Sequence, residues 1–351
     1  MQGTPREQGY IQPAEWHPHE SVWLAWPAHL NLWGPQLDAV RHAFVQLCAA
    51  IADVDASGHP QGERIEVLCA TAEAEAQAGL ALRHLGARTH RFPYGDIWLR
   101  DTAPIFLNGP GGRRAAACFR FDGWGGKYRL GSDDTLAAFV AERTRLPTFQ
   151  LPFVLEGGSV EPDGDGTLLT TRQCNLNPNR GNHGDEAQMS AQLTAALGAE
   201  KVLWLDEGLI NDHTDGHIDT LVRFVAPGVV MAMEPSGPSD PNAEALHAIL
   251  HALTGFTDAR GRRLDVHTVP SPGAVLSDEG ELLAASYVNV YIANRSVVVP
   301  VYGTPHDDEA VERIAALFPG RTTIPVPARA LLHGGGAFHC ISQQLPEPTD
   351  A

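Results

Sequence analysis

The sequence has few cysteines, no long apolar run and no leader-like start. None of its five cysteines has C-x-x-C spacing, which argues against a disulfide framework and a thiolate zinc site. No apolar run approaches the roughly 18 residues that a membrane span needs. The first thirty residues lack the basic start and apolar core of a signal peptide. We therefore expect a protein of the reducing cytoplasm with no membrane partner.

Basic residues are also scarce. The chain has 42 Asp and Glu against 25 Lys and Arg, a formal net charge of -17. Nucleic acid is an improbable partner for such a surface, because phosphate binding needs a basic stripe. An acidic field attracts small cations instead. The remaining composition, 43% hydrophobic and 19% charged, is that of an ordinary globular protein.

Helical and extended patterns alternate along the chain. Apolar spacing of three and four residues predicts helices over 35–54, 71–85, 133–145, 185–197, 241–254 and 307–318. Thr71 and Ser132 are predicted N-caps, and Pro35 suits a first helical turn. Runs rich in Val, Ile and Leu predict buried strands over 65–70, 105–107, 167–171, 201–205, 218–224, 228–233, 282–291 and 296–300. The pattern repeats about every fifty residues, which indicates one unit used several times. We expect a single α/β catalytic domain over 1–351.

Four segments carry polar residues that an ordinary core would not hold: 95–104, 155–159, 211–219 and the glycine run 333–340. A purely structural interpretation remains open for the first two segments: a salt-bridged turn for 95–104 and a plain bulge for 155–159. The third packs three aspartates and two histidines into nine residues beside a predicted strand. The fourth ends at Cys340. His339, next to it, is predicted to point to the opposite face of a strand. The aromatic stretch 119–128 is predicted as a loop over the site or as core.

The residue types in these segments suit one kind of substrate. His217 and Asp219 are two positions apart, so on a strand they would share a face. A histidine beside a carboxylate can move protons near neutral pH. The Cys340 thiol becomes a nucleophile once positive charge lies nearby. A guanidinium supplies that charge, and its paired N–H donors match carboxylates.

These motifs, in this order, resemble the agmatine deiminase and bacterial peptidylarginine deiminase family of the guanidino-group-modifying superfamily. The resemblance covers nearly the whole chain and rests on these segments: PAEWHPHESVWLAWP (13–27), WLRDTAP (98–104), LEGGSVEPDGDGTLLTT (155–171), NLNPNR (175–180), HTDGHID (213–219), SYVNVYIAN (286–294) and GGGAFHCISQQ (334–344). It implies a five-bladed α/β propeller, the pentein fold, built from ββαβ-type repeats.

The resemblance also implies catalytic roles. Cys340 matches the nucleophile and His217 the general acid and base. Asp101 and Asp219 match the carboxylates that grip the guanidinium. The implied reaction is hydrolytic deimination through an amidino-cysteine intermediate, from agmatine to N-carbamoylputrescine and ammonia. No metal or organic cofactor is expected, and a homodimer is possible.

Five further residues are expected to bind substrate. The resemblance implies that Glu156 and Asn289 lie in the active site and that Trp98 lines the substrate channel, and Asp96 and Asp215 are expected toward the far end. Two departures from the family pattern leave the substrate open between agmatine, another alkylguanidine and peptidyl-arginine. Ala337 stands in GGGAFHC where the family usually has Asn, and Gly181 follows NPNR where it usually has Asn.

Other interpretations stay open at this point. His213, Asp215, His217 and Asp219 form a run typical of a metal-dependent ureohydrolase, which would release urea. That interpretation lacks a second aspartate-rich motif and leaves Cys340 without a role. A guanidine-binding protein without activity, or a transferase that passes the amidino group to an amine, would also use some of the candidate cysteine, histidine and aspartate residues.

Overall fold

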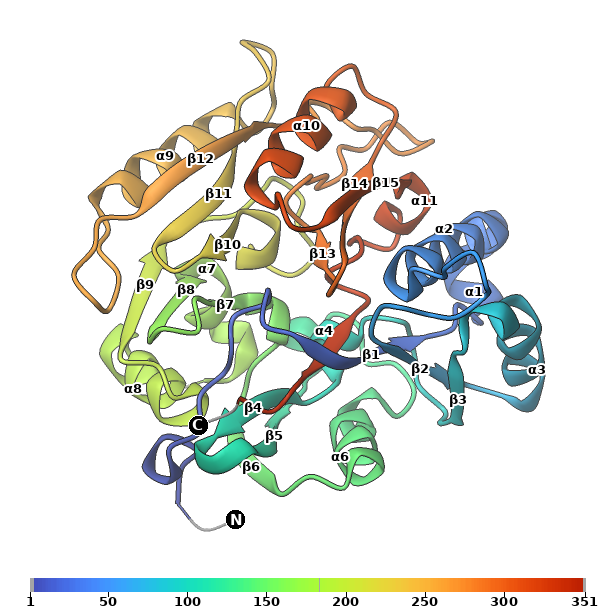
Figure 1. Ribbon diagram of the computed structural model, residues 1–351. Coiled ribbons are helices and arrows are strands. Elements are labelled where there is room, and N and C mark those ends of the chain that lie inside the picture. Colours follow the sequence, from blue (N-terminus) through green and yellow to red (C-terminus); the bar gives the residue numbers. More distant parts are fainter. Residues whose placement is uncertain (1–2, 183, 350–351) are drawn as a thin grey trace.

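The computed structural model describes residues 3–182 and 184–349. The ends of the predicted 1–351 domain, residues 1–2 and 350–351, therefore lie outside the described residues, as does residue 183. The described strands form five sheets, which Figure 1 shows arranged in a ring with the longer helices on the outside. None of the described helices combines the length and the apolar character that crossing a membrane requires.

Four sheets repeat one unit of three consecutive strands. They contain β4 (Ile105–Gly109), β5 (Arg113–Arg120) and β6 (Thr148–Val154); β7 (Val160–Pro162), β8 (Thr167–Thr171) and β9 (Lys201–Leu205); β10 (Val222–Ala226), β11 (Val229–Glu234) and β12 (Asp265–Pro270); and β13 (Tyr291–Ile292), β14 (Ser296–Val301) and β15 (Thr322–Pro327). In each, the first two strands are antiparallel and the third joins the second in parallel. A helix precedes each third strand, so the unit is ββαβ, as the resemblance implied.

The fifth sheet joins the two ends of the chain. Its strands are β16 (Gln343–Pro346), β1 (His19–Ala25), β2 (Arg64–Cys69) and β3 (Arg88–Arg91), in that order. β16 pairs antiparallel with β1, and Val22 lies opposite Gln344. This pairing closes the ring and places the segment before β16, which contains Cys340, beside the segment that follows β3 (Figure 1).

All six predicted helices are present. They are α2 (Leu37–Ala52), α3 (Ala72–Ala81), α6 (Asp133–Thr144), α8 (Glu186–Leu197), α9 (Ala243–Gly255) and α10 (Asp307–Leu317). Thr71 caps α3, since its side chain accepts from the Ala74 N–H at 3.1 Å. Ser132 makes no side-chain cap bond, because its backbone is not in the extended conformation that capping needs. Pro35 lies in a separate 3-10 turn, Gly34–Gln36, before α2.

Two strand predictions were wrong in extent. In 218–224, residues Ile218–Thr220 form a 3-10 turn, η7, and the strand begins only at Val222. In 282–291, only Tyr291 lies in a strand, although residues 285–293 are buried. The buried Arg223 guanidinium donates to the carbonyls of Val288 and Val290, at 3.5 and 2.9 Å. The arginine thus supplies the hydrogen bonds that these buried carbonyls would otherwise accept from a neighbouring strand.

Candidate active site

One pocket of about 210 Å³ gathers side chains from distant parts of the chain. Its lining includes Trp98 and Asp101, Trp124, His213 and Cys340. We call it the Cys340 pocket. Three of the four polar segments singled out in the sequence contribute to its lining, and the fourth, 155–159, lies directly behind Asp101.

Cys340 lies in a turn before β16 and is 7% exposed. Its Sγ is 3.2 Å from Asn289 Nδ2 and 3.6 Å from Asp219 Oδ2. Burial raises the pKa of the Cys340 thiol well above its ordinary value, and the Asp219 and Asp101 carboxylates raise it further. Without a bound cation the thiol is therefore neutral, and a positive ligand would promote its ionisation.

The glycine run lets aromatic rings approach the backbone beside the thiol. A Cβ on Gly336 would lie 2.7 Å from Trp98 Cζ3 and 3.0 Å from Cys340 Sγ. A Cβ on Gly334 would lie 2.4 Å from Trp33 Cη2. The run thus makes room for the two indoles at the edge of the pocket.

His217 precedes the η7 turn, so the predicted shared strand face with Asp219 is wrong. The turn still places both side chains in the interior, where His217 is 1% exposed and Asp219 is fully buried. His217 Nδ1 lies 3.8 Å from Asp101 Oδ1, and Nε2 lies 3.7 Å from Glu156 Oε2. Burial lowers the pKa of His217, but Asp101 and its other neighbours raise that pKa well above its ordinary value. These acidic neighbours favour the protonated imidazole, the form that can donate a proton.

Asp101 and Asp219 flank the backbone of Gly158. Asp101 lies in α4 (Leu99–Thr102), and its Oδ1 accepts from the Gly158 N–H at 3.0 Å. A Cβ on Gly158 would lie 2.6 Å from His217 Nδ1, 2.9 Å from Asp219 Oδ2 and 3.1 Å from Asp101 Oδ1. Three polar side chains thus converge on a point that only glycine leaves open. Among the described residues, Asp219 Oδ1 and both His217 ring nitrogens have no hydrogen-bond partner.

Glu156 is fully buried and paired. Its Oε1 accepts from Arg180 Nε at 2.8 Å. Burial raises the pKa of Glu156, whereas His217 and Arg180 lower it below its ordinary value. Glu156 and His217 lie with Cys174 in a buried group whose ligand atoms are all within 4.8 Å. Arg180 reaches this group as well, which disfavours a metal cation there.

The metal run expected of a ureohydrolase is not assembled. In the described part of the chain, the two groups that could hold a metal contain neither His213, Asp215 nor Asp219. The Asp215 carboxylate instead accepts from Lys127 Nζ at 2.5 Å, from Asn179 Nδ2 at 2.9 Å and from Arg180. Asp215 is not among the residues that line the Cys340 pocket, although its neighbours His213 and Thr214 are, so its contact with the far end of a substrate stays a prediction.

Asp96 does line the pocket. Its carboxylate accepts from Trp33 Nε1 at 3.0 Å and from Trp98 Nε1 at 2.8 Å. Burial raises the pKa of Asp96 above its ordinary value. No ion pair involves Asp96 within residues 3–182 and 184–349. Asp96 is thus a buried acid beside the pocket that makes no ion pair with the described residues.

The two departures from the family pattern lie outside the pocket lining. Ala337 is 2% exposed and packs in the core. Gly181 ends the 3-10 turn Pro178–Arg180 with a φ of 62°. Asparagine also tolerates this left-handed conformation, so glycine meets the same backbone requirement.

Sequence reasoning missed three residues that hold the site in place. Trp124 Nε1 donates to Asp101 Oδ2 at 2.9 Å from the aromatic stretch, which therefore does lie over the site. Arg180 links Glu156 to Asp215. His339 was expected to point away, but its segment is a turn and its Nδ1 lies 2.6 Å from Asp219 Oδ2. Each lies in a segment that the sequence singled out, namely the aromatic stretch 119–128, the motif NPNR and the segment GGGAFHC, but no local pattern assigned these three residues a role.

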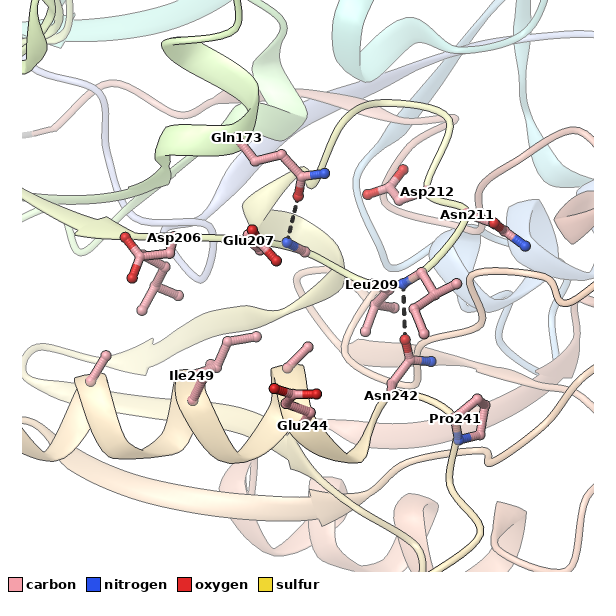
Figure 2. A pocket seen from close by; sticks show the side chains of 16 residues that line it. Gln173, Asp206, Glu207, Leu209, Asn211, Asp212, Pro241, Asn242, Glu244 and Ile249 are labelled. Atoms are coloured by element: carbon pink, nitrogen blue, oxygen red, sulfur yellow. Dashed lines mark hydrogen bonds between the residues drawn. The ribbon is translucent and has the colours of Figure 1, made fainter.

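A larger cleft, of about 690 Å³, lies beside the first part of the loop that leads to His217 (Figure 2). We call it the outer cleft; residues 205–212 and one face of α9 line it. Gln173 Oε1 accepts from the Gly208 N–H at 2.7 Å and Asn242 Oδ1 accepts from the Ile210 N–H at 2.9 Å, which fixes the loop. Glu207 and Glu244 are exposed there. The outer cleft contains no thiol and no histidine among the described residues that line it.

Fold and site together define the class of protein. Four ββαβ sheets and the four-stranded sheet that joins the chain ends form a ring, and a cysteine, a histidine and two carboxylates are buried together within the fold, which is the arrangement implied for the guanidino-group-modifying superfamily. The family model described as Porphyromonas-type peptidyl-arginine deiminase matches residues 11–346, and the chain belongs to this family.

Named relatives agree with this family. The chain is 36% identical over 372 residues to the agmatine deiminase of Pseudomonas fluorescens (strain SBW25), covering 99% of this chain and 98% of the relative. It is 36% identical over 371 residues to the agmatine deiminase of Stutzerimonas stutzeri (strain A1501), with the same coverage. The structure of the agmatine deiminase of Enterococcus faecalis superimposes with a TM-score of 0.90 at 31% identity, covering 99% and 98% of the two chains.

Proposed function

We propose that this chain hydrolyses agmatine to N-carbamoylputrescine and ammonia through a covalent bond to Cys340. One observation carries the proposal. The Cys340 thiol, the His217 imidazole and the Asp101 and Asp219 carboxylates converge beside the Cys340 pocket, which Cys340 and Asp101 line, and Asp219 Oδ1 and both His217 ring nitrogens have no hydrogen-bond partner in the described residues. Buried polar atoms without partners are costly unless a ligand satisfies them.

Binding of a guanidinium supplies the missing hydrogen-bond donor for Asp219 Oδ1. Its N–H donors match Asp101 and Asp219, and its charge offsets the two carboxylates that raise the pKa of Cys340. The thiol therefore loses its proton more readily in the complex than in the free enzyme. Reactivity of Cys340 then depends on the cation that is to be attacked.

The first half of the reaction forms the covalent intermediate. The Cys340 thiolate attacks the guanidinium carbon and makes an S–C bond. His217 donates its proton to the departing amine, the C–N bond breaks, and ammonia leaves. Glu156, 3.7 Å from His217 Nε2 and held by Arg180, keeps the imidazole in place.

Water completes the turnover. Neutral His217 takes a proton from water, whose oxygen attacks the same carbon. The S–C bond breaks, the thiolate is restored, and a ureido group remains on the product. Water is the only co-substrate, and the reaction requires neither a metal nor an organic cofactor.

Asp96 supports agmatine as the substrate. Agmatine has an ammonium at its far end, and Asp96 is an acid in the same pocket without a protein cation. Free arginine would bring a carboxylate toward this acid, which is unfavourable at short range. A peptide would bring an uncharged backbone that gains nothing from Asp96. The names of the relatives agree with this choice.

The test measures ammonia and urea released from agmatine, arginine and a blocked arginine peptide, with and without a metal chelator. We expect ammonia from agmatine at a rate that the chelator does not change, and none from the Cys340→Ala variant. Ammonia from the peptide alone would replace agmatine by peptidyl-arginine. Urea that disappears with chelator would replace the cysteine mechanism by metal-dependent hydrolysis.

The cellular setting belongs to the same proposal. All five cysteines are buried free thiols, which supports the reducing cytoplasm as the compartment. The excess of acidic residues supports a small cation as partner and disfavours nucleic acid. A homodimer stays a prediction that sedimentation would check.

A further inference from the structure

His339 lies between two carboxylates in the interior. The imidazole is fully buried. Its Nδ1 is 2.6 Å from Asp219 Oδ2, and its Nε2 is 3.1 Å from Glu15 Oε1. A carboxylate oxygen of an ionised acid only accepts, so each ring nitrogen must donate. Each ring nitrogen thus lies within hydrogen-bond distance of an acidic oxygen.

The far side of His339 is rigidly held. Glu15 also accepts from Arg100 Nη1 at 2.9 Å and pairs with Arg223 Nη2 at 3.1 Å. Burial raises the pKa of Glu15, but Arg100, His339 and Arg223 lower it well below its ordinary value. The Arg100 N–H donates to the Cys340 carbonyl at 3.1 Å, and its Nε donates to the His339 carbonyl at 3.4 Å. This network fixes both the imidazole and the backbone that carries the thiol.

The near side faces the reacting groups. Asp219 Oδ2 is the oxygen bound by His339, and it is also 3.6 Å from Cys340 Sγ. Oδ1 of the same carboxylate has no partner among the described residues. Burial raises the pKa of Asp219, but the hydrogen bond and charge of His339 bring that pKa below its ordinary value. One oxygen is thus restrained while the other stays available.

We propose that His339 is a positioning residue that holds Asp219 ionised and oriented, so that its free Oδ1 receives a guanidinium N–H. This inference rests on the proposed function for the identity of the ligand. The His339 side chain contacts Asp219 and Glu15, and His339 is not among the residues that line the Cys340 pocket. The groups that face it are Glu15 from the N-terminal segment, Asp219 from η7 and Arg100 from α4, with Arg223 behind Glu15.

Two amide substitutions separate the two sides of the imidazole. In His339→Asn the amide nitrogen occupies roughly the place of Nδ1 and can still donate to Asp219. In His339→Gln it occupies roughly the place of Nε2 and can donate only to Glu15. Both variants remove the charge and keep a polar side chain, so they form a matched pair.

We expect His339→Gln to lower kcat/KM for agmatine by about 10- to 100-fold, the usual effect of losing a hydrogen bond to a charged group, with KM rising. His339→Asn should retain more activity than His339→Gln. Loss of the cation raises the pKa of Asp219, so activity in His339→Gln should fall at a higher pH as the solution is acidified. If the histidine only supports the fold, Tm falls in both variants while KM and the acid limb stay those of the wild type, and the proposal is overturned.

A second readout does not need turnover. Alkylation of Cys340 by 2-chloroacetamidine, which carries an amidinium, is compared with alkylation by neutral iodoacetamide. We expect the ratio of the two rates to fall in His339→Gln and to hold in His339→Asn, because only the former frees Asp219 to turn. An unchanged ratio in His339→Gln overturns the proposal. If the wild type releases no ammonia from agmatine, the proposed function fails, and this ratio still decides the role of His339.

Discussion

The loop 205–219 lines two clefts, and the acidic groups of these clefts differ in burial and in their effect on neighbouring pKa values. The outer cleft has about 690 Å³ and the Cys340 pocket about 210 Å³, yet the candidate catalytic groups gather at the smaller one. Glu207 and Glu244 in the outer cleft are exposed, and water screens their charge (Figure 2). Asp101 and Asp219 are buried, so they shift the pKa values of a neighbouring thiol and imidazole. Catalytic capacity thus follows desolvation and convergence of groups, and volume is a poor guide to it.

The same loop serves both clefts. Asp212 lines the outer cleft, and its carboxylate accepts from the Thr214 N–H at 2.8 Å and from the His217 N–H at 3.2 Å. Asp212 therefore holds the backbone of His217 in position from the side of the outer cleft. The end of the same loop carries His217 and Asp219, whose ring nitrogens and Oδ1 have no hydrogen-bond partner among the described residues.

The largest loss of activity should come from filling the space beside Gly158, where the side chains of His217 and Asp219 converge. Gly158→Ala adds a Cβ 2.6 Å from His217 Nδ1, closer than atoms can pack, so the catalytic side chains must move. We expect kcat/KM for agmatine to fall at least about 100-fold, the usual cost of about 1 Å of misplacement. Steady-state kinetics and circular dichroism of the purified variant check this.

Gly79→Ala is the matched control. Gly79 lies in α3, its φ is not left-handed, and no atom lies within 4 Å of the position that an added Cβ would take. This change should leave turnover unchanged and raise stability by about 0.5–1 kcal/mol, the helical preference for alanine. Equal activity of the two variants would mean that the space at Gly158 is not part of the site.

An intermediate effect, on the KM for agmatine, is expected from a substitution at Asp96. Asp96→Asn removes the charge and keeps a similar shape. We expect KM for agmatine to rise about tenfold, the effect of losing one charge-assisted hydrogen bond. An alkylguanidine of the same length without the amine should keep its KM. A parallel rise for both compounds would show that Asp96 supports the tryptophans and does not read the ammonium.

The smallest effect is expected in the outer cleft. Glu207→Gln combined with Glu244→Gln removes two exposed charges there, and screening makes such charges weak at a distance. We expect kcat/KM for agmatine to change less than about twofold at ordinary ionic strength. The same carboxylate-to-amide change at Asp101 should cost far more. A large loss from the outer pair would break the contrast between the two clefts.

Local patterns predicted much of the fold. Apolar periodicity indicated all six longer helices, and Thr71 was recognisable as a cap. Residues 282–291 were misassigned because burial makes any segment apolar, whether a strand or an irregular stretch that Arg223 satisfies. The η7 turn was mistaken for a strand for the same reason. The number of repeats followed from the family resemblance and not from periodicity.

The sequence by itself determined which residue types this protein has for its chemistry. The run of glycines before Cys340 and the clustered aspartates and histidines of 211–219 were visible without coordinates. Only the tertiary structure decided their states, because a pKa depends on burial and on charges brought from far along the chain. It paired Asp215 with Lys127 and Arg180, and it left Asp96 without a cation among the described residues. It also turned His339 toward Asp219, a contact across 120 positions that no local pattern encodes.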